Sequence, residues 1–105
     1  MLASRTTGNT ISIWDTKNAE VTKILEGHDE YVMCVAFHPT EDNLLVSSSG
    51  DKTIKTWNLS TGDCSSTLKG HASWVHSVAI HPTYASVYAS GSYDNTVKLW
   101  GRRAD

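Results

Sequence analysis

The chain repeats itself with a constant shift of 43 residues, and this repeat limits the folds open to it more than any other feature. Residues 25–58 and 68–101 align without a gap and share 15 identities in 34 positions. Both copies begin near a Gly-His pair and end near a tryptophan, Trp57 or Trp100. A partial copy precedes them, because the same shift leads back to Trp14. A fixed period of this length is typical of a supersecondary unit that stacks on copies of itself.

Short strands rather than helices fit the pattern inside each copy. The apolar runs 44–46 and 87–89 are each followed by a polar turn and then by a segment of alternating polarity that leads to the terminal tryptophan. Each period therefore holds four short strands. The first strand of the second copy spaces Val32 and Val35 three residues apart, which would place them on opposite faces of a regular strand. An extra residue should bulge there and rotate the strand.

Composition excludes several classes of protein. With 39% hydrophobic and 19% charged residues, the chain is typical of a soluble globular domain. A net charge of −2 gives no field that would favour nucleic acid or an acidic membrane. Neither a bilayer span nor a signal peptide is evident, so we expect an intracellular protein, cytoplasmic or nuclear. Cys34 and Cys64 fall at different phases of the repeat and are expected to be free thiols.

Four features in a fixed order resemble the WD-repeat β-propeller family: Gly-His, His-Pro, an aspartate in a turn, and Trp-Asp or Trp-Asn at the end. The resemblance covers nearly the whole chain, and it implies an all-β fold of four-stranded antiparallel blades around a channel. The chain would supply an incomplete set of about 2.4 blades. The implied units are a partial blade at 1–26 with its second, third and fourth strands, a complete blade at 27–69, and a blade without its outer strand at 70–105. The implied strands are 2–4, 10–14 and 20–25, then 31–37, 44–49, 53–58 and 64–68, and finally 74–80, 87–92 and 96–100.

An incomplete set of blades cannot close a ring, and its open edges would invite pairing with other chains. We therefore expect the remaining blades to belong to a longer parent chain. The alternative is that copies of this chain associate into a homo-oligomeric propeller that binds a peptide or another ligand in its channel.

The residue types of a hydrolase triad occur twice: His28, Ser47 and Asp51, and again His71, Ser90 and Asp94. In a hydrolase the aspartate orients the histidine, which takes the serine proton. A catalytic centre needs to be built only once, whereas this set recurs at one phase of the repeat, so a structural role is favoured over an enzyme. The resemblance implies a hydrogen-bond network in which Asp holds His, His reaches Ser, and Ser reaches the indole N–H of Trp57 or Trp100. Ser4 and Trp14 would be its remnant in the first blade, where Gly8 replaces the aspartate and the blade should be loosest.

Metal and nucleic-acid chemistry are both disfavoured. His71, His76 and His81 recur every five residues, which on a strand separates neighbours by roughly 17 Å on opposite faces, so no metal site and no cofactor are expected. His38 and His81 precede prolines and should face solvent. Acidic residues are interspersed among the lysines, so no basic stripe forms that would bind nucleic acid.

Bulky residues at loop edges provide the positive case for binding. Tyr31, Trp74 and Tyr93 stand where the resembled family frequently lines the narrow face on which partner peptides dock. Aromatic side chains with a polar atom suit such a surface. Asp29 would accept a cationic side chain of the partner. The alternative is that Tyr31 and Trp74 only cover the adjacent blade. The sequence therefore predicts a noncatalytic scaffold that binds protein or peptide partners in the assembly of a multiprotein complex.

Overall fold

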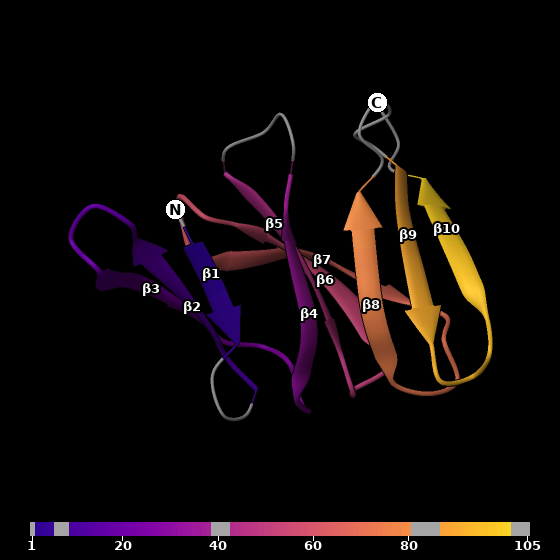
Figure 1. Ribbon diagram of the computed structural model, residues 1–105. Helices are drawn as coiled ribbons and strands as arrows, with labels where there is room; N and C mark the ends of the chain where they lie inside the picture. Colours follow the sequence, from indigo (N-terminus) through magenta and orange to yellow (C-terminus); the bar gives the residue numbers. More distant parts are fainter. Residues whose placement is uncertain (1, 6–8, 39–42, 81–86, 102–105) are drawn as a thin grey trace.

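Three antiparallel sheets lie side by side in the computed structural model, which describes residues 2–5, 9–38, 43–80 and 87–101 (Figure 1). Sheet 1 contains β1 (Leu2–Arg5), β2 (Ile11–Asp15) and β3 (Glu20–Leu25). Sheet 2 contains β4 (Val32–Phe37), β5 (Leu44–Ser49), β6 (Thr53–Asn58) and β7 (Asp63–Lys69). Sheet 3 contains β8 (Val75–Ile80), β9 (Val87–Ser92) and β10 (Val97–Gly101). All bounds lie within one residue of the sequence prediction, and the all-β fold is confirmed.

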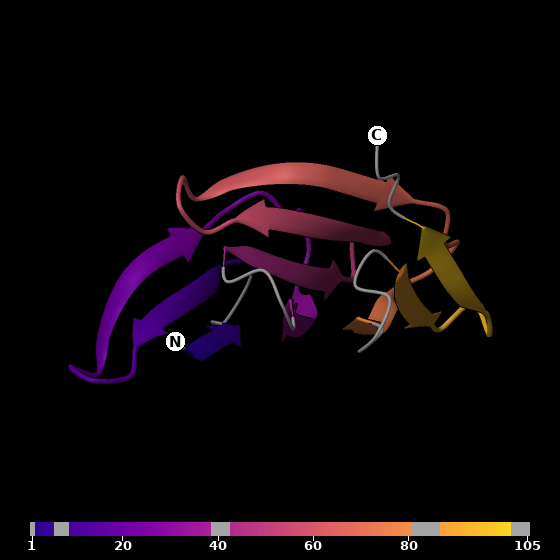
Figure 2. The same ribbon diagram turned by 90° about the horizontal axis from the view of Figure 1, so that it is seen from above.

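Neighbouring strands of every sheet are consecutive in the chain, so each sheet is a simple meander. Seen from above, the three sheets spread like a fan, with β7 along the outer side of sheet 2 (Figure 2). Within the described ranges, no helix is present that is long and apolar enough to cross a membrane.

The first strands of sheets 2 and 3 both contain the bulge that the sequence predicts. The register of β4 against β5 shifts between Val32 and Cys34, and β8 shifts against β9 at the equivalent place. The inserted residue brings Val32 and Val35 to the same buried cluster. Val75 and Val78 share a second cluster in the same way. The odd spacing of these valines is therefore the sequence signal of the bulge.

Sheet 2 is covered on both sides, and its strand β5 is buried along its full length. One face packs against sheet 1 in a core of Ile11, Ile13, Leu25, Val32, Leu45, Trp57 and Leu59. The other face packs against sheet 3 in a core of Val46, Ile54, Val75, Val78 and Tyr88. Burial of each such aliphatic side chain contributes about 1.5–3 kcal/mol. Leu45 and Val46 are neighbours in sequence and lie in different cores because side chains alternate along a strand.

The outer faces of sheets 1 and 3 expose apolar side chains. Val97 and Leu99 of β10 are each 75% exposed. Val21 and Ile24 of β3 are also exposed, on the side of sheet 1 that does not face sheet 2. Within the described residues, these two faces are not covered by another sheet.

The expectation that His38 faces solvent is wrong, because the residue is buried, with only 7% of its surface exposed. The His38 N–H donates to the Leu44 carbonyl at 3.0 Å, so the pairing of β4 with β5 continues one residue beyond the strand. Alternation then places the His38 ring on the same side as Cys34, which is the side that sheet 3 covers. The matching prediction for His81 falls outside the described residues.

Candidate functional site

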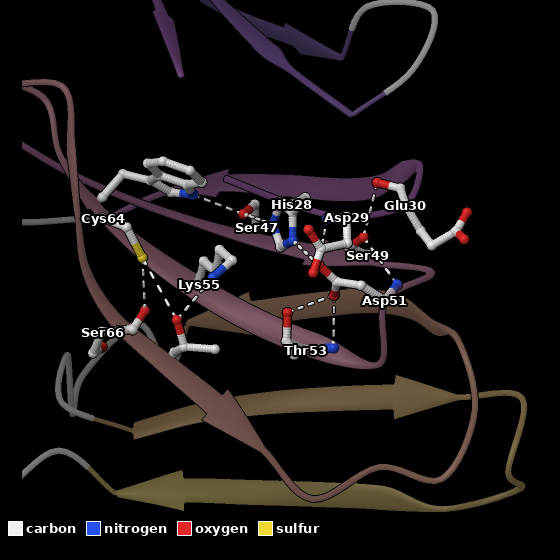
Figure 3. A network of polar contacts seen from close by, with 12 residues as sticks. His28, Asp29, Glu30, Ser47, Ser49, Asp51, Thr53, Lys55, Cys64 and Ser66 are labelled. Atoms are coloured by element: carbon white, nitrogen blue, oxygen red, sulfur yellow. Dashed lines mark hydrogen bonds and ion pairs between the residues drawn. The ribbon is translucent and has the colours of Figure 1, made fainter. Parts of the chain in front are cut away.

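A chain of hydrogen bonds links the loop before β4 to three segments of sheet 2 (Figure 3). The Trp57 Nε1–H donates to Ser47 Oγ at 2.8 Å, and Ser47 Oγ lies 2.6 Å from His28 Nε2. His28 Nδ1 in turn lies 2.8 Å from Asp51 Oδ2. Because Ser47 Oγ accepts the indole hydrogen, its own hydrogen is free to go to Nε2, and the hydrogen on Nδ1 goes to the carboxylate. The geometry is therefore satisfied by the Nδ1–H tautomer of His28.

Each member of this network comes from a different segment. His28 lies in the loop before β4, Ser47 on β5, Asp51 in the turn between β5 and β6, and Trp57 on β6. An added Cβ at Gly27 would lie only 3.0 Å from Trp57 Cη2, so glycine allows the indole to pack against the backbone beside His28. The network thus joins the connection between sheets 1 and 2 to the interior of sheet 2.

Asp51 accepts further hydrogen bonds from the loop before β4 and from its own turn. The Asp29 N–H donates to its Oδ2 at 3.1 Å, and the Thr53 N–H donates to its Oδ1 at 2.9 Å. Burial by itself would raise the pKa of the Asp51 carboxyl, but hydrogen bonds from His28, Thr53 and the Asp29 amide outweigh burial and hold the pKa well below its ordinary value. The carboxylate is therefore the charged form throughout the neutral range.

Sheet 3 contains the same network 43 residues later. His71 lies 3.0 Å from Asp94 and 2.7 Å from Ser90 Oγ, and the Trp100 indole donates to Ser90 Oγ at 2.8 Å. Asp94 also accepts hydrogen bonds from the hydroxyl and the backbone N–H of Thr96. Those bonds, with the Ala72 amide, hold the pKa of Asp94 well below its ordinary value, although burial opposes them. The structure therefore brings together both sets of four residues that the sequence grouped.

Neither serine of the two networks is accessible. Ser47 is fully buried and Ser90 is 2% exposed, and each Oγ already accepts an indole N–H. His28 and His71 are buried as well. A nucleophile has to reach a substrate carbonyl, which these oxygens do not do while the sheets are packed. The arrangement can hold loops and strands together, and it offers no open seryl oxygen for acyl transfer.

Sheet 1 provides only part of the expected remnant. Trp14 is half-buried on β2, and the backbone of Ser4 pairs with Ser12. The Ser4 side chain and Gly8 lie outside what the structure describes. The contact expected between Ser4 and Trp14, and the looseness expected for this unit, remain predictions.

Three aromatic rings lie close together beside the turn that contains Asp94. We refer to Trp74, His76 and Tyr93 as the aromatic cluster. The ring centroids of Trp74 and Tyr93 are 6.4 Å apart, and those of His76 and Tyr93 are 4.9 Å apart. Tyr93 is 60% exposed and Trp74 43% exposed. Sequence reasoning considered His76 only as a metal ligand and did not place it beside Tyr93. His76 occupies the bulge of β8, and an added Cβ at Gly91 would lie 3.1 Å from its Cε1. The bulge therefore turns the imidazole toward Tyr93.

Trp74 also reaches across to sheet 2. An added Cβ at Gly50 would lie 3.4 Å from Trp74 Cδ2 and 3.3 Å from the Cβ of Glu30. The indole and the Glu30 side chain therefore both pack against Gly50. The Gly50 N–H donates to the Tyr31 carbonyl at 2.9 Å, and the Tyr31 side chain is 58% exposed. Trp74 thus covers the adjacent sheet and still presents nearly half of its surface, which combines the two alternatives that the sequence left open.

Asp29 borders a hollow whose lining does not include the aromatic cluster. It is exposed, and the hollow has a volume of about 490 Å³ and a lining that also includes Asp51, Lys52 and Lys69. Charges of both signs therefore line this hollow. Glu30, which sequence reasoning did not single out, is an exposed acidic residue whose Cβ lies against Gly50, as the Trp74 indole does.

The remaining histidines and cysteines lie in separate environments. His71 belongs to the polar network and His76 to the aromatic cluster, whereas His81 is outside the described residues. In the described part of the chain, no three His, Cys, Asp or Glu side chains converge as metal ligands would. Cys34 and Cys64 are both free, as predicted.

Comparison with known proteins relates the repeats to one family of models and to two curated proteins. The family model described as "WD domain, G-beta repeat" matches residues 19–58 and 62–101. The nuclear distribution protein PAC1 of Komagataella phaffii is 39% identical over 54 residues, which are 49% of this chain and 11% of that protein. The PAC1 protein of Coprinopsis cinerea is 41% identical over 39 residues, which are 37% of this chain and 9% of that protein. The chain thus spans about a tenth of the length of the curated relatives that it matches.

Proposed function

Because the chain belongs to the WD-repeat family, we propose that it is a noncatalytic protein-interaction scaffold that contributes to the assembly of a multiprotein complex. WD repeats in general mediate protein–protein interaction and are generally noncatalytic. We place the contact with the partner at the aromatic cluster, extended by Tyr31 and Asp29. The protein would act inside the cell, in the cytoplasm or the nucleus.

The observation that carries this proposal is the exposure of Trp74 and Tyr93 in a pair of contacting rings. Large rings lose little conformational entropy on binding and bury much area, so clustered aromatic residues commonly provide most of the affinity of an interface. Truncation of such a residue typically costs about 2 kcal/mol or more in binding. An exposed pair of rings held by its neighbours suits such a contact.

The polar network of sheet 3 positions the aromatic cluster. The Tyr93 N–H donates to the Trp74 carbonyl at 3.0 Å, and the Ser92 hydroxyl donates to the same carbonyl at 2.7 Å. Asp94, the residue after Tyr93, accepts from the Ala72 N–H at 2.9 Å. The segments that carry Trp74 and Tyr93 are therefore tied to each other, which lowers the cost of ordering them on binding.

Carboxylates near this surface favour a partner with basic or hydrogen-bond-donating side chains. Glu30 lies beside Trp74, and Asp29 is the next exposed carboxylate along the chain. Charges at the rim of an interface mainly increase the association rate and select the partner. We therefore expect the affinity of the partner to weaken as salt concentration rises.

A comparison of two variants tests the proposal. The chain with Trp74→Ala and Tyr93→Ala, and a control with Leu99→Ala on the exposed face of β10, would each be used for quantitative capture from cytoplasmic and nuclear extracts. We expect the wild type and the control to retain the same proteins and the double variant to lose them. Circular dichroism would establish that both variants fold. If the folded double variant retains the same proteins, the aromatic cluster is not the docking surface.

A homo-oligomeric propeller is a second candidate, and the exposed apolar side chains of β3 and β10 favour it. Such faces on the outer sides of sheets 1 and 3 would be buried if copies packed against one another. Light scattering of the purified chain tests this candidate. A discrete multiple of 11.5 kDa supports it, and a monomeric mass rules it out.

A further inference from the structure

The aromatic cluster combines apolar ring faces with hydrogen-bond donors. Trp74 is 43% exposed and Tyr93 60% exposed. Neither the indole N–H of Trp74 nor the hydroxyl of Tyr93 forms a hydrogen bond with another described residue. An indole N–H only donates, and a phenol hydroxyl donates as well as accepts. The surface therefore suits a partner that is apolar and rich in hydrogen-bond acceptors.

The backbone beside these rings is already paired. The Trp74 carbonyl accepts from the Tyr93 N–H at 3.0 Å and from the Ser92 hydroxyl at 2.7 Å. The Tyr31 carbonyl accepts from the Gly50 N–H at 2.9 Å. A partner that binds by adding a strand needs the unpaired N–H and C=O groups of a sheet edge. Recognition at the aromatic cluster therefore falls to the side chains.

Donors on this surface favour one backbone conformation in the partner. A helix uses its own carbonyls in internal hydrogen bonds, so its backbone has few acceptors to offer. A polyproline II segment has no internal hydrogen bonds, and its carbonyls remain free to accept. Proline also lacks a backbone N–H, so its contact with an apolar ring leaves no donor without a partner. A proline-rich segment thus supplies both apolar rings and acceptors.

The arrangement of the rings matches the dimensions of such a segment. The ring centroids of Trp74 and Tyr93 are 6.4 Å apart, and two residues of a polyproline II helix advance by about 6.2 Å. Trp74 packs against Gly50, and the His76 ring lies 4.9 Å from that of Tyr93. The rings are therefore positioned before a partner arrives, as is a polyproline II segment, which lowers the entropic cost of binding.

We propose that the aromatic cluster binds a proline-rich segment in the polyproline II conformation. The prolines pack on Trp74 and Tyr93, and carbonyls of the segment accept from the indole N–H and the Tyr93 hydroxyl. This inference rests on the proposed function, because it names the kind of partner that docks on the surface. The carboxylate contacts described above concern residues that flank the prolines.

Three blocked peptides of equal length test the proposal on the ¹⁵N-labelled chain by NMR. Hexaproline is the ligand, alternating Gly-Ser is flexible and has no apolar rings, and alternating Lys-Gly is basic. We expect hexaproline to shift the indole signal of Trp74 and the backbone amide signal of Tyr93 in a saturable way, while the indole signal of Trp57 stays unchanged. Each of the other two peptides should bind at least roughly tenfold more weakly, because neither presents apolar rings.

Substitutions separate the role of the donors from that of the rings. Trp74→Phe and Tyr93→Phe each remove a donor and retain a ring, so each should weaken hexaproline binding roughly fivefold, the equivalent of one neutral hydrogen bond. Trp74→Ala should abolish saturable binding. Leu99→Ala, on the exposed face of β10, is the control and should bind as the wild type does. Backbone amide signals report binding and folding in every variant.

The proposal is overturned if hexaproline gives no saturable shift at the aromatic cluster, if either control peptide binds equally well, or if both phenylalanine variants bind hexaproline as the wild type does. Failure of this inference is distinguishable from failure of the scaffold function. If hexaproline does not bind but the double variant Trp74→Ala, Tyr93→Ala still loses the captured proteins, the partner class is wrong and the docking surface stands. If hexaproline binds there and the double variant retains those proteins, the ligand class stands and the docking surface for them lies elsewhere.

Discussion

The indole N–H of Trp57 donates a hydrogen bond of 2.8 Å to Ser47 Oγ, an oxygen that is completely buried in sheet 2. This contact decides how the Asp-His-Ser arrangement is to be understood. The lone pair that a nucleophile would offer to a substrate is engaged by a tryptophan, and the same contact recurs between Trp100 and Ser90. The two networks connect each inter-sheet loop to the strands that follow it.

Replacement of Ser47 by alanine should destabilise the fold. The change leaves the Trp57 N–H and the His28 Nε2 buried without their partner, and each loss costs about 1–3 kcal/mol. We expect the free energy of unfolding to fall by about 2–4 kcal/mol, a large part of the stability of a small domain. Urea unfolding followed by tryptophan fluorescence measures this change, and Ser60→Ala, at an exposed serine, serves as the control. Wild-type stability in Ser47→Ala, or in the equivalent Ser90→Ala, would contradict a structural role.

Replacement of the glycine beside a network histidine should lower the stability of the protein for a steric reason. The added methyl group of Gly70→Ala would lie 3.0 Å from Trp100 Cη2, so the indole has to move. Overpacking of this kind costs about 1–3 kcal/mol. Gly101→Ala is the matched control, because an added Cβ there meets no atom within 4 Å. Thermal melts of both variants should separate them by several degrees, and equal melting temperatures would show that the indole is not confined.

The repeat and the residue pattern were sufficient to predict the strands and the bulge and to group the residues of the two polar networks, whereas the bonds within each network were implied by the resemblance to the WD-repeat family. The reason is that these features are local or recur at one phase: Val32 and Val35 reveal the bulge by their spacing, and Ser47 and Ser90 occupy the same position of their copies. Thr53 and Thr96 also recur, and they could have been assigned to the networks by the same signal.

Contacts between sheets could not be predicted in this way. Burial of His38 depends on how far the pairing of β4 with β5 continues, which residue types alone do not specify. Stacking of His76 on Tyr93 depends on the direction in which the bulge turns a side chain. The position of Trp74 over Gly50 depends on how closely sheet 3 approaches sheet 2.

Acid should destabilise the protein through Asp51 and Asp94. The pKa of each carboxyl is lowered in the folded state, so its contribution to stability is present above the unfolded pKa of about 3.9 and is lost as the pH falls below it. We expect the free energy of unfolding to decrease from about pH 5 downward. Asp51→Asn should be less stable at pH 7 and should show a shallower decrease in acid. Asp63→Asn, at an exposed position of β7, should keep the wild-type slope, and identical slopes in all three proteins would refute the assignment.

The turn between β5 and β6 should become more stable when Lys52 is replaced by asparagine. Lys52 has a φ of 73°, in the left-handed region that is unfavourable for most side chains, and Asn95 occupies the equivalent turn with a φ of 68°. Asparagine tolerates this conformation better, so Lys52→Asn should raise the free energy of unfolding by a few tenths of a kcal/mol, up to about 1 kcal/mol. Urea unfolding is sufficient to detect this change. The reverse change, Asn95→Lys, should have the opposite sign, and a loss of stability in Lys52→Asn would mean that the lysine makes a compensating contact.

Removal of the Tyr88 hydroxyl should not weaken the protein. In most buried tyrosines the hydroxyl has a partner, and its deletion costs about 1 kcal/mol or more. Here the hydroxyl is buried without a partner among the described residues, so Tyr88→Phe relieves a penalty, and we expect the free energy of unfolding to be unchanged or higher by about 1 kcal/mol. Tyr93→Phe, at the exposed ring, is the control and should be neutral. A clear loss of stability in Tyr88→Phe would mean that the folded protein itself satisfies the hydroxyl.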